Sequence, residues 1–299
     1  MLKGIDISNN QGKIGFTPHD YDIDFCIAKA TESTGFVDPY CDGFIQDCIA
    51  NDILWGFYHF NGTANPVSEA NFFVENTRNY FGHGIPALDY EEVNENDRYW
   101  VEQFVQRVYD LTGVWCMVYM SASWLPRFQG SWICQKCGLW LAGYPYPTTN
   151  WRYDDPPYGS YPWDFIAIWQ FTSSLQIGWV KGIDADIAYM DKTAWMKYAK
   201  SSSTVKPDTP VQPVKDYKTV VKQVLDGQWG NGAERTKRLE SAGYDAQFVQ
   251  DTINEYYEIA EQVIKGEWGN GWNRQQALNG AGYDYETIQG IVNAILGAN

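Results

Sequence analysis

The segment Ile85-Pro86-Ala87-Leu88-Asp89-Tyr90-Glu91-Glu92-Val93 begins with apolar residues and ends with acidic ones. Its apolar first half predicts a buried strand. Its acidic second half predicts the polar edge of the sheet at which that strand ends. Asp89 and Glu91 share one face of an extended chain, with Cβ atoms about 7 Å apart, so each carboxylate perturbs the ionisation of the other. Glycoside hydrolysis uses such a pair, one carboxyl group protonated and one charged. A solvated acidic loop is the simpler alternative.

Short apolar segments alternate with segments of helical spacing across the first two thirds of the chain. This pattern predicts parallel βα units, and a run of this length predicts a barrel. Because little helix separates the later strands, we expect an α/β fold with an irregular βα barrel, TIM-like but incomplete. The expected strands are 4–8, 22–30, 54–60, 85–91, 114–119, 139–142 and 165–171, and the expected helices are 39–51, 66–80 and 97–111.

Polar residues recur where the expected strands end. In a parallel barrel these ends share one rim, and active sites lie on that rim. The placement favours a catalytic role for the Asp89/Glu91 pair over a solvated loop. The residues at these ends are Asp6, Glu32, Tyr58, Asp89, Glu91, Tyr119 and Gln170.

The C-terminal part of the chain contains a repeat. Val224 to Gly232, with the sequence VLDGQWGNG, recurs as VIKGEWGNG from Val263 to Gly271, and the tetrapeptide AGYD at 242–245 recurs at 281–284. Each unit predicts a three-helix module, and two copies behind the Pro-rich linker 201–213 suit avidity for a repetitive surface. The binding candidates are Trp229, Arg235, Trp268 and Arg274; the alternative is that the tryptophans are core and the arginines cap helices.

Composition restricts the partners. A net charge of −15 argues against nucleic acid and against anionic membranes, and no apolar run is long enough for membrane insertion. Six cysteines are too few for a disulfide scaffold, so we expect reduced thiols. Cys134-x-x-Cys137 lacks a second such pair and the three histidines are scattered, so we expect neither metal nor cofactor. The start Met1-Leu2-Lys3-Gly4 leads directly into a strand, with no signal peptide.

Residues 2–195 resemble the family 25 glycoside hydrolases, the Chalaropsis-type lysozymes. The resemblance rests on the order and spacing of several motifs. It implies a flattened, irregular βα barrel that hydrolyses the β-1,4 bond between N-acetylmuramic acid and N-acetylglucosamine in peptidoglycan. The motifs are GIDIS at 4–8 with Gln11-Gly12, KATE at 29–32, GFYHF at 56–60, ALDYE at 87–91, IWQFTS at 168–173 and GIDADIAY at 182–189.

The resemblance also implies roles for individual residues. Glu91 is expected as the general acid/base with a raised pKa, and Asp89 as its charged partner. Asp6 takes the first acidic position of the family. For the fourth acid we prefer Asp186, although Ala188 stands where the family usually has Asn, and Asp184 is the alternative, otherwise a substrate-binding residue. The residues Tyr58, Tyr119 and Trp169 are candidates to stack on sugars, with barrel packing as the alternative.

The repeats resemble choline-independent cell-wall-binding repeats of phage lysozymes. Together these features imply a phage endolysin that is made in the host cytoplasm, released with the help of a holin, and acts on bacterial peptidoglycan. The expected division is a barrel over 1–198, a linker over 199–214, and wall-binding repeats over 215–256 and 257–299.

Two other functions fit part of the sequence. A chitinase-like barrel also carries a D-x-E strand, but the longer acidic run D-x-x-D-x-D-x-E of such enzymes is absent upstream of Asp89. A non-catalytic wall-binding or adhesion protein could retain a degenerate barrel. The intact acids Asp6, Asp89 and Glu91 argue against it.

Overall fold

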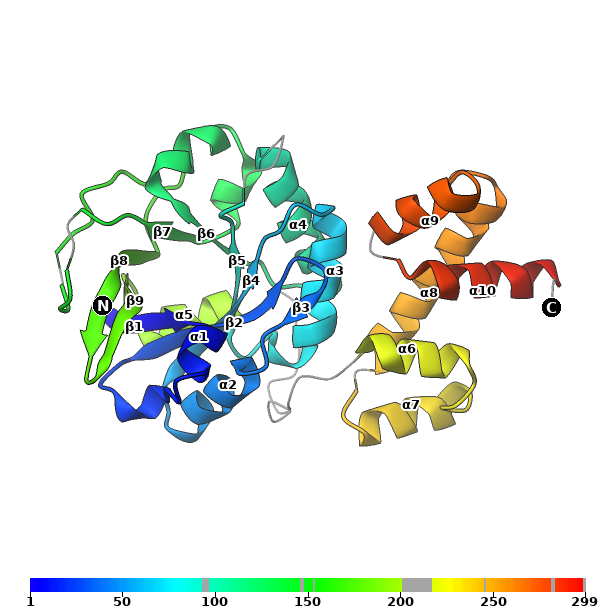
Figure 1. The fold of residues 1–299 in the computed structure, drawn as a ribbon, viewed down its shortest axis with the longest axis horizontal. Helices are drawn as coiled ribbons and strands as arrows, with labels where there is room; N and C mark the ends of the chain where they lie inside the picture. The colour runs from blue at the N-terminus through cyan, green and yellow to red at the C-terminus, as the bar shows by residue number, and fades with distance from the viewer. Residues whose placement is uncertain are drawn as a thin grey trace.

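The computed structural model describes residues 1–92, 97–145, 148–152, 154–200, 217–244, 246–280 and 283–297. It contains a barrel, followed along the chain by a region of short helices (Figure 1). From Ser201 onward, the linker expected over 199–214 lies outside the described residues. So do Val93 and three residues of the repeated AGYD turns, namely Asp245, Ala281 and Gly282.

Eight strands close the barrel, which confirms the expected α/β barrel fold. Closure comes from β1 (Leu2–Ile7), which pairs in parallel with β2 (Phe25–Glu32). A short strand, β3 (Phe36–Val37), pairs with β2 at the edge of the sheet. The remaining barrel strands are β4 (Leu54–Phe60), β5 (Ile85–Asp89), β6 (Met117–Ser121), β7 (Leu139–Ala142), β8 (Ile168–Ile177) and β9 (Val180–Ala188).

The irregularity of the barrel is concentrated in β9. This strand runs antiparallel to both of its neighbours, β1 and β8, and the sequence patterns did not predict it as a strand. A two-residue turn joins it to β8, and Gly178 in that turn has a φ of +57°. Only glycine adopts such a conformation without a steric penalty. The aspartates and the glycine within β9 are unusual in strands, which explains why the local sequence did not reveal it.

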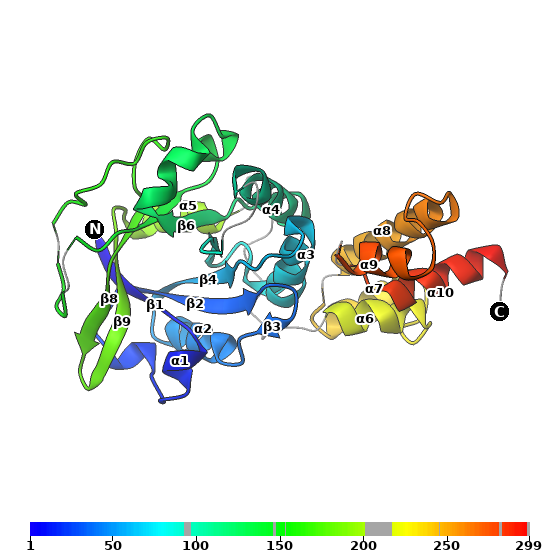
Figure 2. The same cartoon turned by 45° about the horizontal axis from the view of Figure 1, so that its top comes forward.

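Helices cover the outside of the first half of the barrel. The predicted helices correspond to α2 (Cys41–Ala50), α3 (Pro66–Thr77) and α4 (Asp97–Thr112), which lie outside the sheet in Figure 2. The side chain of Asn65 caps α3 by accepting the N–H groups of Val67 and Ser68. Between the later strands lie loops and 3₁₀ turns such as η3 (Ala122–Phe128) and η4 (Trp132–Gln135), as the scarcity of helical spacing predicted.

The barrel interior is apolar at one end and polar at the other. Strand alternation points Phe25, Tyr58, Met117 and Trp140 inward, and Trp195 of α5 (Lys192–Ala199) packs on Phe25 with ring centroids 4.7 Å apart. At the carboxyl ends of the strands the inward positions are polar instead. These positions are buried and belong to Asp6, Asp89, Gln170 and Asp186.

The helical region contains α6 (Tyr217–Leu225), α7 (Gly232–Ser241), α8 (Ala246–Ile264), α9 (Gly271–Gly280) and α10 (Tyr285–Leu296). The 19-residue helix α8 runs through the boundary expected between the repeats at 256/257. It therefore serves as the last helix of the first repeat and the first helix of the second. Across the described ranges, no helix has both the length and the apolar character needed to cross a membrane.

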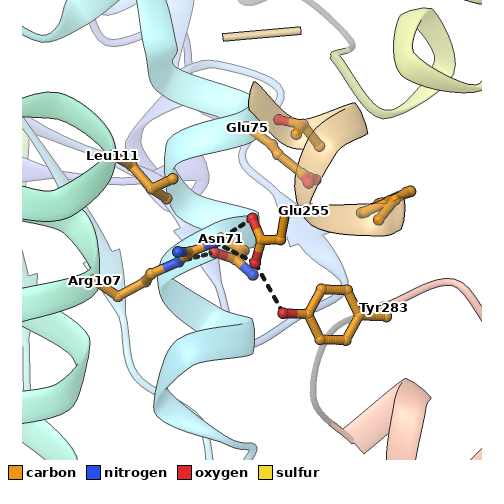
Figure 3. A pocket seen from close by; sticks show the side chains of 8 residues that line it. Asn71, Glu75, Arg107, Leu111, Glu255 and Tyr283 are labelled. Atoms are coloured by element: carbon orange, nitrogen blue, oxygen red, sulfur yellow. Dashed lines mark hydrogen bonds and ion pairs between the residues drawn. The ribbon is translucent and has the colours of Figure 1, made fainter. Parts of the chain in front are cut away.

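An ion pair connects the helical region to the barrel. Arg107 on α4 donates to both carboxylate oxygens of Glu255 on α8, each at 2.7 Å, and to Oδ1 of Asn71 on α3 at 2.6 Å (Figure 3). The hydroxyl of Tyr283 donates to the same glutamate at 2.8 Å. Nη2 of Arg107 makes both contacts with the carboxylate while Nε holds Asn71, so this charge-assisted contact joins α8 to α3 and α4 of the barrel.

Candidate active site

Five acidic side chains gather at the polar end of the barrel, and we call them the carboxyl cluster: Asp6, Asp89, Glu91, Asp184 and Asp186. Strand register explains the gathering, because Asp6 of β1 lies opposite Asp184 of β9, and Gln170 of β8 lies opposite Asp186. Asp89 ends β5, and Glu91 follows two residues later. The structure thus brings together the five acids that the resemblance implied for the site, whereas Glu32, the other acid predicted at the rim, pairs with Lys29 at 2.5 Å.

The members of the cluster differ in depth. Asp186 is fully buried, and Asp6 and Asp89 are each 7% exposed. Asp184 is half-buried, and Glu91 is exposed at the mouth of the barrel. An exposed acid above buried ones suits a group that must meet a large substrate, with its supports lying beneath it.

Burial raises the pKa of each aspartate in the cluster. The pKa of Asp6 is well above its usual value because the group is buried and faces the charge of Asp186. Burial likewise holds the pKa of Asp186 well above the usual range, and it raises the pKa of Asp184 to about 8 with help from the charges of Asp6 and Glu91. Asp184 therefore holds its proton at neutral pH, and burial favours the neutral form of the other aspartates.

Asp89 and Glu91 form a hydrogen-bonded pair. Loss of solvation raises the pKa of Glu91, and the hydrogen bond from Asp89 opposes that shift. The pKa of Asp89 is raised well above its usual value by burial, then by Glu91 and Asp6. The sequence predicted a charged Asp89; burial in the folded protein opposes that charge, and the charged state stays a prediction. The Oδ1 atom of Asp89 is buried and has no hydrogen-bond partner within the described structure.

Asn61 holds the chain on which Glu91 lies, and sequence reasoning missed it. Its Oδ1 accepts the backbone N–H groups of Glu91 at 2.7 Å and of Glu92 at 2.8 Å. Its own backbone N–H donates to the carbonyl of Asp89 at 2.9 Å. The available signal was its position as a polar residue directly after β4, at the same rim as the other strand ends.

A buried pair fixes the loop that carries Asn61. Glu69 of α3 accepts from the backbone N–H groups of Gly62 at 2.7 Å and Ala64 at 2.9 Å, and lies 3.0 Å from Nε2 of His59. Burial lowers the pKa of His59. Its other ring nitrogen lies 2.8 Å from the hydroxyl of Thr31. Because these buried polar groups are paired with one another, Asn61 rests on a rigid support.

The three aromatic candidates have different surroundings. Tyr58 and Tyr119 face the barrel interior near the carboxyl cluster, and Tyr119 donates to Oε1 of Gln170 at 2.8 Å. Trp169 is 1% exposed, and its indole N–H donates to the carbonyl of Gly143 at 2.9 Å. The stacking role predicted for Trp169 is therefore wrong. Strand alternation points it away from Gln170 and the interior, into the core outside the sheet.

A cavity of about 250 Å³ opens beside Glu91. Tyr119 lines it from the barrel side, Trp124 lines it from η3, and Tyr144 lines it from the loop after β7. The guanidinium of Arg127 lies 4.7 Å from the Trp124 ring centroid, over its face. Flat aromatic faces next to hydroxyl groups fit a sugar ring, so this cavity is a candidate site for one saccharide unit. Trp124 lies in the short 3₁₀ helix η3 and Tyr144 in a loop, and neither segment has the periodic pattern by which the sequence located strand ends.

The candidate residues of the repeats make the same contacts in both copies. The indole N–H of Trp229 donates to Gln223 at 2.9 Å, and that of Trp268 donates to Gln262 at 3.0 Å. Each tryptophan also packs edge-on against the tyrosine of its AGYD turn, which is Tyr244 in one repeat and Tyr283 in the other. Both tryptophans thus contribute to packing.

The two arginines join helices within each repeat. Arg235 donates to Gln250 of α8, and Arg274 donates to Gln289 of α10 at 3.2 Å. Trp272 differs from all of these residues, because it is 71% exposed, and the matching position in the first repeat is Ala233.

The cysteines are free thiols, and five of the six are buried. Burial raises the pKa of Cys134 to about 11. Within the described ranges, no three His, Cys, Asp or Glu side chains are arranged to hold a metal ion.

Comparison with known proteins identifies both parts of the chain. The model of the glycosyl hydrolases of family 25 matches residues 5–180, and the CW_7 repeat model matches residues 218–256 and 257–296. A lysozyme of Streptococcus phage Cp-7 is 29% identical over 272 residues, covering 84% of this chain and 69% of the phage protein.

Two further relatives cover the barrel alone. An N,O-diacetylmuramidase of Chalaropsis is 26% identical over 198 residues, which is 59% of this chain and 90% of that enzyme. A family GH25 lysozyme from Aspergillus fumigatus superposes with a TM-score of 0.50 at 25% identity, covering 67% of this chain and 99% of that structure.

Proposed function

This chain belongs to the glycosyl hydrolases of family 25, and from that premise we propose that it cleaves the β-1,4 bond between N-acetylmuramic acid and N-acetylglucosamine in peptidoglycan. Its membership makes it a lysozyme-type glycoside hydrolase. The observation that carries the finer proposal is the exposed Glu91 in hydrogen-bond contact with the buried Asp89, beside a cavity of sugar size.

Glu91 acts as the general acid. In the free enzyme the Asp89–Glu91 pair shares a proton that burial holds on Asp89. An acetamide N–H of the bound sugar that donates to Asp89 favours the charged form of Asp89, and the proton then moves to Glu91. Glu91 delivers it to the glycosidic oxygen as the C1–O bond breaks.

Asp89 then supports the positive charge that develops on the sugar. A hydrogen-bonded pair leaves no room for a water between the two carboxyl groups, which inverting enzymes need. We therefore favour attack on C1 by the acetamide oxygen of the substrate itself, oriented by Asp89. Water later opens this intermediate, and Glu91 takes its proton. Asp6 and Asp186 lie beneath the pair, and Asp184 and Tyr58 lie within electrostatic reach of Asp89.

The helical region binds the wall in this proposal. The match to two CW_7 repeats supports it, as does the likeness to a phage lysozyme over most of the chain. We propose the division into a barrel over 1–198, a linker over 199–214, and repeats over 215–256 and 257–299. Within the repeats, Arg235 and Arg274 remain candidates for wall contact, together with the outer edges of Trp229 and Trp268.

The same likeness supports the role of an endolysin. The enzyme then reaches the bacterial wall from inside an infected cell, after a holin has opened the inner membrane. Lysis of cells that express the chain with and without a holin tests this route. Lysis that needs no holin would contradict it.

Mass spectrometry of fragments released from purified peptidoglycan, reduced with borohydride first, tests the bond specificity. Reduced muramic acid ends are expected, and reduced glucosamine ends would overturn the assignment. Chitin should release nothing, since otherwise the chitinase-like alternative holds. Glu91→Gln should abolish release while wall binding persists. Glu102→Gln, on the outer helix α4, is the matched control and should stay active.

A further inference from the structure

Gln170 lies at the centre of a hydrogen-bond network that crosses the barrel interior. It is 3% exposed, and its side chain reaches three other strands or loops. The Oε1 atom accepts the hydroxyl of Tyr119 at 2.8 Å and also that of Tyr144. The Nε2 atom donates to Oδ2 of Asp6 at 2.7 Å. This one amide therefore joins the carboxyl cluster to two tyrosines that line the cavity.

The two tyrosines decide which way the amide of Gln170 faces. Burial raises the pKa of both tyrosines above the usual value, so both remain neutral O–H donors. With two O–H groups directed at Oε1, the N–H₂ group of Gln170 must face the opposite side. That side is Asp6, which therefore presents Oδ2 as an acceptor.

The second partner of Asp6 is Asp186. The indole N–H of Trp140 donates to Oδ1 of Asp186 at 2.7 Å, and Oδ2 of Asp186 is buried without a donor from any other described group. The carboxyl groups of Asp6 and Asp186 are in hydrogen-bond contact. Two buried carboxyl groups in contact favour sharing one proton, and a proton held there gives the remaining oxygen of Asp186 a donor.

We propose that Gln170 is a positioning residue that sets where this proton lies. By donating to Oδ2 of Asp6, it keeps that oxygen an acceptor and leaves only the other oxygen of Asp6 to share the proton with Asp186. The Asp6–Asp186 pair then holds one proton and carries a single negative charge beneath Asp89 and Glu91. The inference rests on the function proposed for Glu91, because the charge of this pair helps to keep the Asp89–Glu91 pair protonated.

Several other groups face Asp6 and belong to its electrostatic surroundings. These ionisable groups must be the same in every variant that is compared, so Gln170 is the only residue to be changed. The groups are Asp184 on β9, Asp89 and Glu91 at the end of β5, Tyr58 on β4, Cys26 on β2, and Tyr119 and Tyr144 at the cavity.

Two substitutions separate hydrogen bonding from packing. Gln170→Glu preserves the shape, and a neutral carboxyl group can accept from both tyrosines and donate to Asp6 through its O–H. An ionised one cannot donate. Gln170→Met fills similar space without polar atoms. The measurement is kcat/KM on soluble peptidoglycan fragments as a function of pH.

We expect Gln170→Glu to approach wild-type activity at acidic pH and to fall at least tenfold below it as the introduced carboxyl group ionises. We expect Gln170→Met to be at least tenfold less active throughout, mainly in kcat. A methionine variant with wild-type activity, or a glutamate variant whose pH profile parallels that of the wild type, would overturn the proposal.

A measurement on the unmodified protein covers the case in which these variants fail to fold. Carboxyl ¹³C NMR of aspartate-labelled protein should show Asp6 and Asp186 titrating as a coupled pair that keeps one proton at pH values where the exposed aspartates are already fully ionised. Full ionisation of both groups together with the exposed aspartates would overturn the inference. If the wild type releases no fragments, the function proposed for Glu91 fails, and the titration still decides whether the shared proton exists.

Discussion

Oδ1 of Asn61 accepts the backbone N–H of Glu91 at 2.7 Å, and so one buried amide after β4 fixes the residue expected to donate the proton after β5. The neighbouring strands supply this link, because β4 and β5 pair in parallel and Phe60 lies opposite Asp89. Asn61 is fully buried, so its hydrogen bonds have no competition from water.

Replacing Asn61 by alanine should lower kcat by roughly 10- to 100-fold with a smaller change in KM, because Glu91 loses its fixed position relative to the bond. The free energy of unfolding should fall by about 1–2 kcal/mol, since the variant removes the acceptor of the Glu91 and Glu92 N–H groups. Kinetics on soluble fragments and urea unfolding measure the two effects. Asn51→Ala is the control, because Asn51 also binds a backbone carbonyl but lies exposed at the end of α2. Equal kcat values for the two variants would contradict this role of Asn61.

Asp184 gives a prediction about stability and pH. Its pKa rises from 3.8 to about 8 in the folded protein, so the folded state binds the proton more tightly than the unfolded chain. This stabilisation is complete below about pH 4 and is lost as the pH rises through about 8. Asp184→Asn removes the dependence and should be more stable than the wild type at pH 8, by on the order of 1–2 kcal/mol.

Urea unfolding at pH 4, 6 and 8 measures this difference, which should shrink towards zero at the lowest pH. Asp52→Asn is the matched control, because the side chain of Asp52 is 99% exposed. Its difference from the wild type should stay within about 0.5 kcal/mol at every pH. If Asp184→Asn instead becomes less stable than the wild type as the pH rises, the carboxyl group of Asp184 is charged and favourably paired in the folded protein.

The Arg107–Glu255 contact predicts that the helical region is held against the barrel. Arg107→Glu should release this region and increase the radius of gyration in small-angle X-ray scattering, because two like charges replace an ion pair. Charge exchange in Arg107→Glu/Glu255→Arg should restore most of the compact form. Activity on soluble fragments should stay unchanged in both variants, since neither residue reaches the carboxyl cluster. A wild-type protein as extended as the single variant would refute the contact.

The tryptophans of the second repeat should separate binding from stability. Trp272→Ala should change the free energy of unfolding by less than about 0.5 kcal/mol, because the side chain is 71% exposed, and should weaken wall association. Trp268→Ala should instead cost about 2–4 kcal/mol, because Trp268 packs against Tyr283 and bonds to Gln262. Sedimentation with purified walls and thermal unfolding measure the two properties. Wall association that survives Trp272→Ala intact would exclude this side chain from the contact.

The amino-acid sequence by itself determined the features that depend on neighbours along the chain. Alternation placed Asp89 and Glu91 on one face of a strand end, helical spacing located α2 to α4, and the offset of 39 residues revealed the repeated modules. These follow from local backbone geometry, because the periods of strands and helices are the same in any fold.

Only the tertiary structure decided which distant groups meet and how they ionise. Gln170 and Asp6 are 164 positions apart and touch because β9 enters antiparallel between β1 and β8, which no local pattern predicted. Closure of the barrel also places the side chain of Trp169 in the core between the sheet and the outer layer. It also buried Asp89, which raises the pKa of this carboxyl group well above its usual value. The register between strands and the loss of solvation arise only when the barrel has assembled. The spacing of residues along one strand therefore predicts neither of them.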